Sequence, residues 1–251
     1  MRSRQFSRRP RLNSPPHNKA GGHSDRGSSP SSKKSLCESI FALLSLLFFP
    51  PPPTFKTSSG RKRTLVLDLD ETLVHTNTNF DSGEGILPPQ LRLDVETSNS
   101  RGGKSRIFYV RIRPYLSEFL KEVSELFEVV VFTASEKSYA DPIVASIFNE
   151  AGCEIPRQCY YRPSCDQITG MHVKDLNKVR NDLSKVILLD NSVSAAAYQP
   201  TNLMTISSWY GAADDTELLD TLELLRMLTT VSDVRNILSL RLQRGSDLSE
   251  L

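Results

Sequence analysis

The chain has 251 residues, enough for one domain of ordinary size and an additional tail. Hydrophobic residues make up only 38% of it, and 15 prolines exceed 12 glycines, which indicates a folded core with a polar appendage. Residues 1–63 hold 13 Lys or Arg against Asp25 and Glu38, a charge of +11, so the remainder carries −9 of the total of +2. An acidic folded part is a poor partner for nucleic acid, and we expect no direct nucleic-acid binding. The composition also excludes collagenous, coiled-coil, repeat and disulfide-scaffold proteins.

The first 60 residues divide into two unlike parts. Residues 1–38 are basic, rich in Ser, Arg and Pro, and nearly without large apolar side chains, so we expect disorder. A segment rich in Arg and Ser and poor in acids is also typical of an organelle transit peptide. Residues 39–60 form a linker in which the apolar run 40–49 precedes four prolines. Ten helical residues rise about 15 Å, roughly half of a bilayer core, so this run is too short to span a membrane. It could contact a membrane interface, act in a signal sequence or pack on the domain.

The cysteines do not follow a metal-binding pattern. Cys37, Cys153, Cys159 and Cys165 form no Cys-x-x-Cys pair, and the four histidines complete no zinc spacing. We expect free thiols, with a Cys159–Cys165 disulfide as the alternative.

A regular alternation of strands and helices begins at Thr64. The apolar runs 65–67, 129–132 and 186–189 predict strands buried on both faces, and 204–206 predicts a fourth strand. Together with the intervening helices, they predict the α/β class: a Rossmann-like parallel sheet with helices on both faces.

Three helices are expected between or after these strands. Apolar residues at helical spacing predict a helix over 116–127, with Pro114 in its first turn, and another over 214–227. A third is expected to begin with Asp141 as N-cap and Pro142 at its first position, and to end before Gly152.

Two stretches depart from this alternation. Residues 91–97 and 106–112 alternate apolar and polar side chains around a polar segment, which predicts a β-hairpin. Residues 159–173 suggest a similar but shorter β insertion. We interpret both as small β insertions near the rim of the sheet.

Polar residues follow each of the three buried strands directly. Asp68 and Asp70 follow the first strand, Thr133 the second, and Asp190 and Asn191 the third. Ligands of open α/β sheets bind outside the carboxyl ends of the strands, so these side chains are expected around one crevice. Two close carboxylates repel each other unless a cation or proton intervenes, and a few carboxylate oxygens with waters suit Mg²⁺.

Two other interpretations of the acids after the first strand are weaker. An EF-hand loop fails because Leu73 stands where that loop needs Gly and Asn79 where it needs Glu. Helix capping would require one acid and would explain neither Thr133 nor Asp190.

Four sequence blocks occur in order and at suitable spacing: DLDETLVH at 68–75, FTAS at 132–135 with YADP at 139–142, VKDL at 173–176, and LDNS at 189–192. Together they resemble the small C-terminal-domain phosphatases (NLI-interacting-factor-like) of the haloacid dehalogenase superfamily. The likeness implies a phosphatase domain over about 61–242, with the haloacid dehalogenase fold and a C-terminal tail at 243–251.

The resemblance implies a role for each acid. Asp68 would attack the phosphorus and form an aspartyl-phosphate, and Asp70 would protonate the leaving oxygen and then activate water. Mg²⁺ would be held by the side chains of Asp68 and Asn191 and the main-chain carbonyl of Asp70, with Asp190 supporting its waters.

The resemblance also implies groups that bind the substrate phosphate. Thr133 and Lys174 would hydrogen-bond its oxygens, and Arg162 matches a family position that contacts phosphate, although a surface salt bridge explains Arg162 nearly as well. Two positions depart from the family pattern: Val193 replaces a proline, and Arg180 stands one place before the usual arginine.

By resemblance, the expected function is a Mg²⁺-dependent protein serine/threonine phosphatase acting on phosphoserine near proline. The RNA polymerase II C-terminal domain is the expected partner, and the nucleus the expected location. One alternative is a phosphatase that contacts an endomembrane through 40–49, and another is a weakly active phosphopeptide-binding module. If 1–38 is a transit peptide, the expected location is an organelle.

Overall fold

A computed structural model describes residues 62–80, 83–96 and 105–240. The expectations for 1–38, for 39–60 and for the tail at 243–251 lie outside these residues. Within the described part of the chain, no helix is long and apolar enough to cross a membrane.

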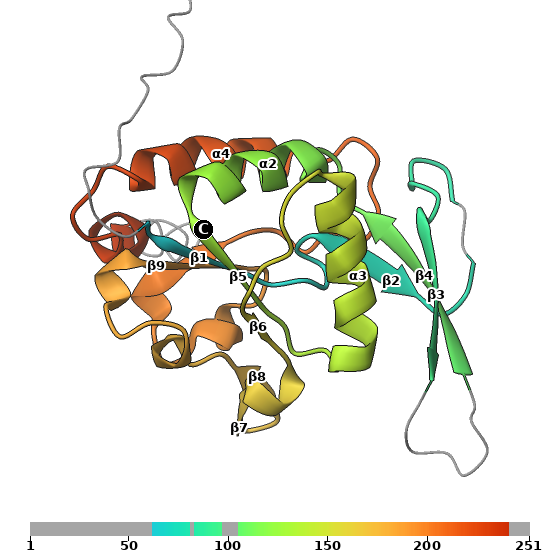
Figure 1. Cartoon of the computed structure of the whole chain (residues 1–251), viewed down its shortest axis with the longest axis horizontal. Coiled ribbons are helices and arrows are strands. Elements are labelled where there is room, and N and C mark those ends of the chain that lie inside the picture. The colour runs from blue at the N-terminus through green and yellow to red at the C-terminus, as the bar shows by residue number, and fades with distance from the viewer. Residues whose placement is uncertain (1–61, 81–82, 97–104, 241–251) are drawn as a thin grey trace, which may run out of the picture. The chain divides into compact units, whose positions relative to one another are not determined.

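The centre of the domain is a five-stranded parallel sheet (Figure 1). Its spatial order is β10-β9-β1-β5-β6, so β1 is the central strand, with β9 and β5 on either side. All three central strands are short apolar runs, and a side chain in such a run finds apolar contacts on both faces of the sheet. The strands are β1 (Thr64–Leu67), β5 (Glu128–Phe132), β6 (Cys159–Tyr160), β9 (Val186–Asp190) and β10 (Leu203–Thr205).

The expected parallel sheet covered on both faces is confirmed, but α-helices cover one face and short 3-10 turns cover the other. Three α-helices, α2 (Leu116–Leu126), α3 (Lys137–Glu150) and α4 (Glu217–Leu228), contribute to the core on one face. Figure 1 shows α2 and α4 side by side. The other face is covered by short 3-10 turns, of which η2 (Leu176–Lys178) and η4 (Val193–Ala196) bury Leu176 and Ala196 against β9 and its neighbours. The remaining 3-10 turns are η1 (Arg162–Ser164), η3 (Leu183–Lys185) and η5 (Pro200–Asn202).

The expected start of the third helix was wrong. Helix α3 begins at Lys137, so Pro142 lies inside it and Asp141 is not its N-cap. The added first turn carries Tyr139 and Ala140, and Ala140 is fully buried in the core, which favours helix there despite the proline further on. The other end follows expectation, since Gly152 adopts the left-handed conformation just beyond the helix.

The predicted hairpin is present and has a third strand. Strands β3 (Leu91–Glu96) and β4 (Ser105–Ile112) pair antiparallel, and β2 (Val74–Asn77), which the sequence pattern did not indicate, pairs with the other edge of β4. This three-stranded insertion lies between β1 and α2 in the chain and projects beside α3 in Figure 1.

The shorter insertion predicted over 159–173 divides between two sheets. Cys159–Tyr160 forms the edge strand β6 of the main sheet, while β7 (Asp166–Ile168) and β8 (Met171–Val173) form a separate hairpin. Its two-residue turn, Thr169-Gly170, has positive φ at both positions, as the favoured hairpin turn requires. Cys153, Cys159 and Cys165 are free thiols, so the alternative disulfide is absent.

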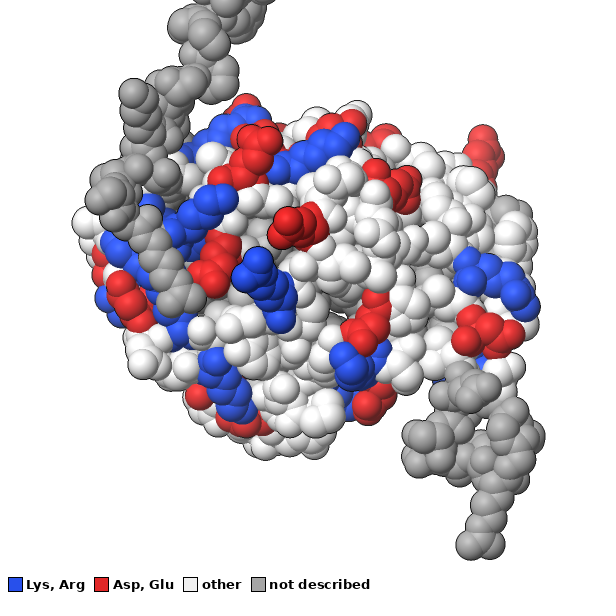
Figure 2. Space-filling model, viewed as in Figure 1, with Lys and Arg blue, Asp and Glu red and all other residues white. Residues whose placement is uncertain are grey.

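Charges of both signs are mixed on the face of the molecule shown in Figure 2. Several are paired: Arg226 on α4 binds Glu122 on α2 through two nitrogens, and Lys137 lies 2.7 Å from Asp141. Such exposed pairs contribute little to stability, typically about 0–1 kcal/mol each.

Candidate active site

The carboxyl ends of β1, β5 and β9 meet at one cavity of about 270 Å³. Parallel register aligns Leu67 with Val131 and with Leu189, so the polar residues that follow emerge side by side. The Asp68 amide extends this register by donating to the Leu189 carbonyl at 3.0 Å. Six of the residues predicted for the site line this cavity: Asp68, Asp70, Thr133, Lys174, Asp190 and Asn191.

Lys174 lies between two buried carboxylates. Its ammonium donates to Asp68 Oδ1 at 2.5 Å and to Asp190 Oδ2 at 2.6 Å. The second oxygen of Asp190 accepts from the Ser192 amide at 2.8 Å. Asp190 therefore accepts a hydrogen bond at each side-chain oxygen, one from Lys174 and one from the Ser192 amide. An ammonium has three N–H groups, so one remains for a ligand oxygen in the cavity.

Asp68 and Lys174 shift each other's pKa values. Burial raises the pKa of Asp68 to about 7, although the neighbouring Lys174 ammonium acts in the opposite direction. Burial lowers the pKa of Lys174, but the two carboxylates outweigh it and hold the pKa above its ordinary value. The lysine thus stays charged, and the site retains an excess of negative charge that favours a further cation.

Asp70 lies on the turn that follows β1 and is bonded through both side-chain oxygens. Ser135 donates to Oδ2 at 2.6 Å, and Tyr139 donates to Oδ1 at 2.5 Å. Burial raises the pKa of Asp70, and the bonds from Ser135 and Tyr139 offset part of that rise. A carboxyl group with a raised pKa can hold a proton for transfer.

The oxygen atoms at this site fit Mg²⁺. Asp68 Oδ2, the main-chain carbonyl of Asp70 and Asn191 Oδ1 are hard donors of the type that Mg²⁺ prefers. Thr72 Oγ1 donates to Asn191 Oδ1 at 3.2 Å, and Asn191 Nδ2 donates to Ser208 Oγ at 2.8 Å. These two bonds hold the amide group from both ends. No cluster of three His, Cys, Asp or Glu side chains suited to a metal occurs among the described residues, so a bound ion would depend on amide and main-chain oxygens as well.

Two residues predicted to bind the substrate phosphate, Thr133 and Arg162, lie in different surroundings. Thr133 is buried at the cavity, and its Oγ1 accepts from the Ser135 amide at 3.0 Å, which leaves its hydroxyl proton for a ligand. Arg162 does not line the cavity. Its side chain is 48% exposed, donates to the Ala134 carbonyl at 2.6 Å and pairs with Glu136 at 3.3 Å, the surface arrangement that the sequence left open.

The two departures from the family pattern lie outside the contacts just described. Arg180 donates to the Lys62 carbonyl at 2.8 Å and to Thr64 Oγ1, at the start of β1 and away from Lys174. Val193 is exposed at the beginning of η4. Neither side chain bonds to the acids of the cavity.

The sequence interpretation gave no role to four residues that orient the acids and the amide. They are Thr72, Ser135, Tyr139 and Ser208. The first three lie within the motif blocks, so their position was a usable signal. Ser208 follows β10 in a segment without a motif, and only the folded chain places it beside Asn191.

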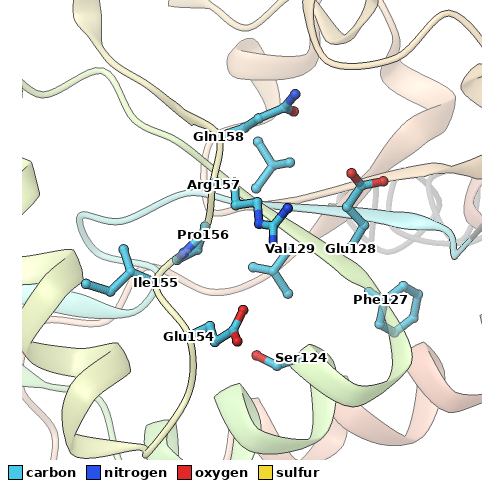
Figure 3. Close-up of a pocket in the computed structure, with 10 residues that line it drawn as sticks. Ser124, Phe127, Glu128, Val129, Glu154, Ile155, Pro156, Arg157 and Gln158 are labelled. Carbon is cyan, nitrogen blue, oxygen red and sulfur yellow. The ribbon is translucent and has the colours of Figure 1, made fainter.

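A second cavity lies at the opposite end of β5 (Figure 3). It has a volume of about 290 Å³, and Val129, Glu154 and Arg157 project toward it. The strand begins here at Glu128 and ends at Phe132, next to Thr133, so the strand's length separates this cavity from the predicted residues. A comparable volume alone does not mark a reaction site, because none of the predicted acids lines this one.

Comparisons with known proteins agree with the motifs. The family model for NLI interacting factor-like phosphatases matches residues 63–235. The "Probable C-terminal domain small phosphatase" of Dictyostelium discoideum is 42% identical over 176 residues, covering 70% of this chain and 54% of the relative. "CTD nuclear envelope phosphatase 1" of Xenopus tropicalis is 35% identical over 204 residues, covering 77% and 78%. "Carboxy-terminal domain RNA polymerase II polypeptide A small phosphatase 1" of Homo sapiens is 37% identical over 187 residues, covering 74% and 67%. The match thus spans about half the length of the Dictyostelium protein.

Proposed function

Because this chain belongs to the family of NLI interacting factor-like phosphatases, we propose that it is a Mg²⁺-dependent phosphoprotein phosphatase that acts through an aspartyl-phosphate. The observation that carries this proposal is the convergence of Asp68, Asp70 and Lys174 at one cavity with Thr133 and Asn191. Asp68, Asp70 and Asn191 would hold the ion, which would supply positive charge for the transferring phosphoryl group.

Asp68 is the proposed nucleophile. Its carboxylate oxygen attacks the phosphorus, the P–O bond to the serine or threonine breaks, and the phosphoryl group is transferred to the carboxylate. Lys174 keeps Asp68 in place through the 2.5 Å contact and presents its remaining N–H to a phosphoryl oxygen. The Thr133 hydroxyl donates to another oxygen.

Asp70 is the proposed acid and base. Its raised pKa favours the protonated form that the departing alkoxide needs. After the proton is transferred, the Asp70 carboxylate accepts a proton from water as that water attacks the phosphorus. The bond between phosphorus and the Asp68 oxygen then breaks, which regenerates the carboxylate and releases inorganic phosphate. Tyr139 and Ser135 hold the carboxyl group in place during both steps.

We propose a phosphoserine near proline as the substrate, as in the C-terminal domain of RNA polymerase II. The names of the human and Dictyostelium relatives support the C-terminal domain as target. An acidic folded part suits a peptide with one or two phosphates better than a long polyanion. The nucleus is the proposed location, and the name of the Xenopus relative makes its envelope the first alternative.

The decisive experiment uses the full chain with phosphoserine-proline peptides in Mg²⁺. We expect turnover that stops with EDTA, and capture of the acyl-phosphate state with beryllium fluoride. Asp68→Asn should abolish both, because an amide is not a nucleophile toward phosphorus.

Asp166→Asn is the matched control. Asp166 on β7 is a partly exposed carboxylate that pairs with Lys178 of η2, outside the cavity, so this variant should turn over normally. Wild-type activity in Asp68→Asn would refute the nucleophile. Phosphopeptide binding without turnover by the unaltered chain would favour the phosphopeptide-binding module instead.

A further inference from the structure

Arg113 is a buried arginine placed directly after β4, outside the catalytic cavity. Its residue is 1% exposed, and its guanidinium is bonded on every side. Nε and Nη2 bind the two oxygens of Asp215 at 2.8 Å each, and Nη2 also binds Glu217 at 3.0 Å. The two acids offset its charge, which makes burial of the guanidinium tolerable.

The third nitrogen of Arg113 joins two main-chain segments. Nη1 donates to the Thr72 carbonyl at 3.0 Å and to the Ser207 carbonyl at 3.1 Å. Thr72 belongs to the turn after β1, and Ser207 to the segment after β10. One planar group therefore sets the separation of two segments that are distant in sequence.

Further bonds fasten the same two segments. The Trp209 amide donates to the Glu71 carbonyl at 2.8 Å, next to the Arg113 contact. Glu217 accepts from the Ser207 amide at 2.9 Å while its other oxygen binds Arg113. Arg113 and Glu217 thus act together on Ser207, one through its carbonyl and the other through its amide.

The two segments carry the two hydrogen-bond partners of the Asn191 amide. Thr72 donates to its oxygen, and Ser208, next to Ser207, accepts from its nitrogen. Each hydroxyl can donate or accept, and together they hold the amide from both ends. If the segments separated, the amide would lose a bond at one end, and Oδ1 would no longer be held in its position at the cavity.

We propose that Arg113 is a positioning residue for the divalent cation. It acts through the segments of Thr72 and Ser208 on the position of Asn191 Oδ1. This inference rests on the proposed function, in which Asn191 is a ligand of Mg²⁺. Loss of an outer partner of a metal ligand typically reduces metal affinity by about 10- to 100-fold, and we expect this effect for Arg113→Lys.

The experiment measures Mn²⁺ binding to the full chain by electron paramagnetic resonance of the free ion, which requires no turnover. Lysine keeps the charge near Asp215 but cannot reach both carbonyls with a planar fork. Arg113→Lys should bind Mn²⁺ about tenfold or more weakly. Its kcat should recover at saturating Mg²⁺, with the KM for phosphopeptide unchanged.

Arg111→Lys is the matched control. Arg111 is equally buried, lies two residues earlier, and donates to the Leu87 carbonyl at 2.7 Å. It lies outside the cavity, so its replacement should alter stability without altering Mn²⁺ affinity. Ser208→Ala, at an exposed position, tests the same chain of contacts if Arg113→Lys fails to fold, and it should also weaken Mn²⁺ binding.

The outcomes separate this inference from the proposed function. Unchanged Mn²⁺ affinity in both Arg113→Lys and Ser208→Ala would overturn the role of Arg113 while leaving the phosphatase intact. Failure of the unaltered chain to bind Mn²⁺ or Mg²⁺ would overturn the metal site, and this inference with it. Equal weakening in Arg111→Lys would show a general loss of stability and would also overturn it.

Discussion

Lys174 lets two acids share a small buried volume. Two carboxylates without a counter-charge would be driven to take up protons, and a lone buried ammonium would tend to lose one. With Asp68 and Asp190 both within 2.6 Å of its nitrogen, the lysine stays ionised and holds both acids. Removing one partner of such a buried group typically costs about 3–5 kcal/mol, because the other charges lose their compensation.

Tyr139 tests how the second acid is tuned. Tyr139→Phe removes the 2.5 Å hydrogen bond to Asp70, which lowers the pKa of that acid against the effect of burial. A hydrogen bond to a charged group contributes about 1.5–3 kcal/mol. We therefore expect the pKa of Asp70 to rise further and kcat to fall by about tenfold, the factor that corresponds to about 1.4 kcal/mol. A profile of kcat against pH from 5 to 9 measures both.

Tyr161→Phe supplies the comparison. Tyr161 makes its side-chain hydrogen bond to Asp141, outside the catalytic cavity, so the pH profile should not move. A profile that shifts equally in both variants, or in neither, would contradict the role assigned to Tyr139.

Among the elements, the buried strands were the most predictable. Val66 in β1, Val130 in β5 and Leu188 in β9 belong to apolar runs that suit only a strand covered on both faces. The acids that follow these runs were found for the same reason, since parallel strands bring their carboxyl ends together. The short strands β2 (VHTN) and β6 (CY) were missed because neither contains an apolar run like that of β1, which is also short.

Helix α3 shows why local signals are insufficient. An acid followed by proline is a strong start signal, and it placed the helix start at Asp141. The chain instead forms an earlier turn, which buries Ala140 and brings the Tyr139 hydroxyl to Asp70. Ser208 and Arg113 could not be placed from sequence for a related reason. Their partners are distant in the chain, and only the tertiary fold reveals them.

Two glycines provide a test of backbone requirements. Gly152 ends α3 with φ +67, and an added Cβ would meet nothing within 4 Å. Gly211 has φ +112, and its Cβ would lie 3.0 Å from Arg111 and from Ile86. We expect Gly152→Ala to reduce the free energy of unfolding by about 1–2 kcal/mol from conformation alone. Gly211→Ala should cost more, because crowding is added to strain.

Urea denaturation measures the difference, with an unchanged m-value showing that only stability has altered. A Gly211→Ala variant as stable as Gly152→Ala would mean that the segment around Ile86 moves aside freely. That result would contradict the close packing seen there.

For the molecule as a whole, cation binding and pH should be coupled. In the metal-free protein, burial raises the pKa of Asp68 to about 7, above its ordinary value near 3.9. The native state then holds a proton that the unfolded chain has lost, so this contribution to stability declines as pH rises through about 7. A divalent cation would replace that proton, and binding should be tighter at pH 8 than at pH 6.

The thermal midpoint of the full chain, with and without Mg²⁺, measures this coupling. We expect a larger Mg²⁺-induced rise at pH 8 than at pH 6, because a ligand at fixed concentration stabilises the native state more when its Kd is lower. In Asp68→Asn the pH dependence of the rise should be much reduced. An equal rise at both pH values in the unaltered chain would show that Asp68 does not compete for protons with the ion.

The two ends of the three-stranded insertion meet at one point of the backbone. The Arg113 amide donates to the Leu73 carbonyl at 3.0 Å, where the chain leaves for β2 and where it returns from β4. A module whose entrance and exit coincide can be lengthened, shortened or exchanged with little entropic penalty for closing the chain around it. The parallel sheet and the three-stranded insertion could therefore diverge at separate rates, with Leu73 and Arg113 at the junction between them.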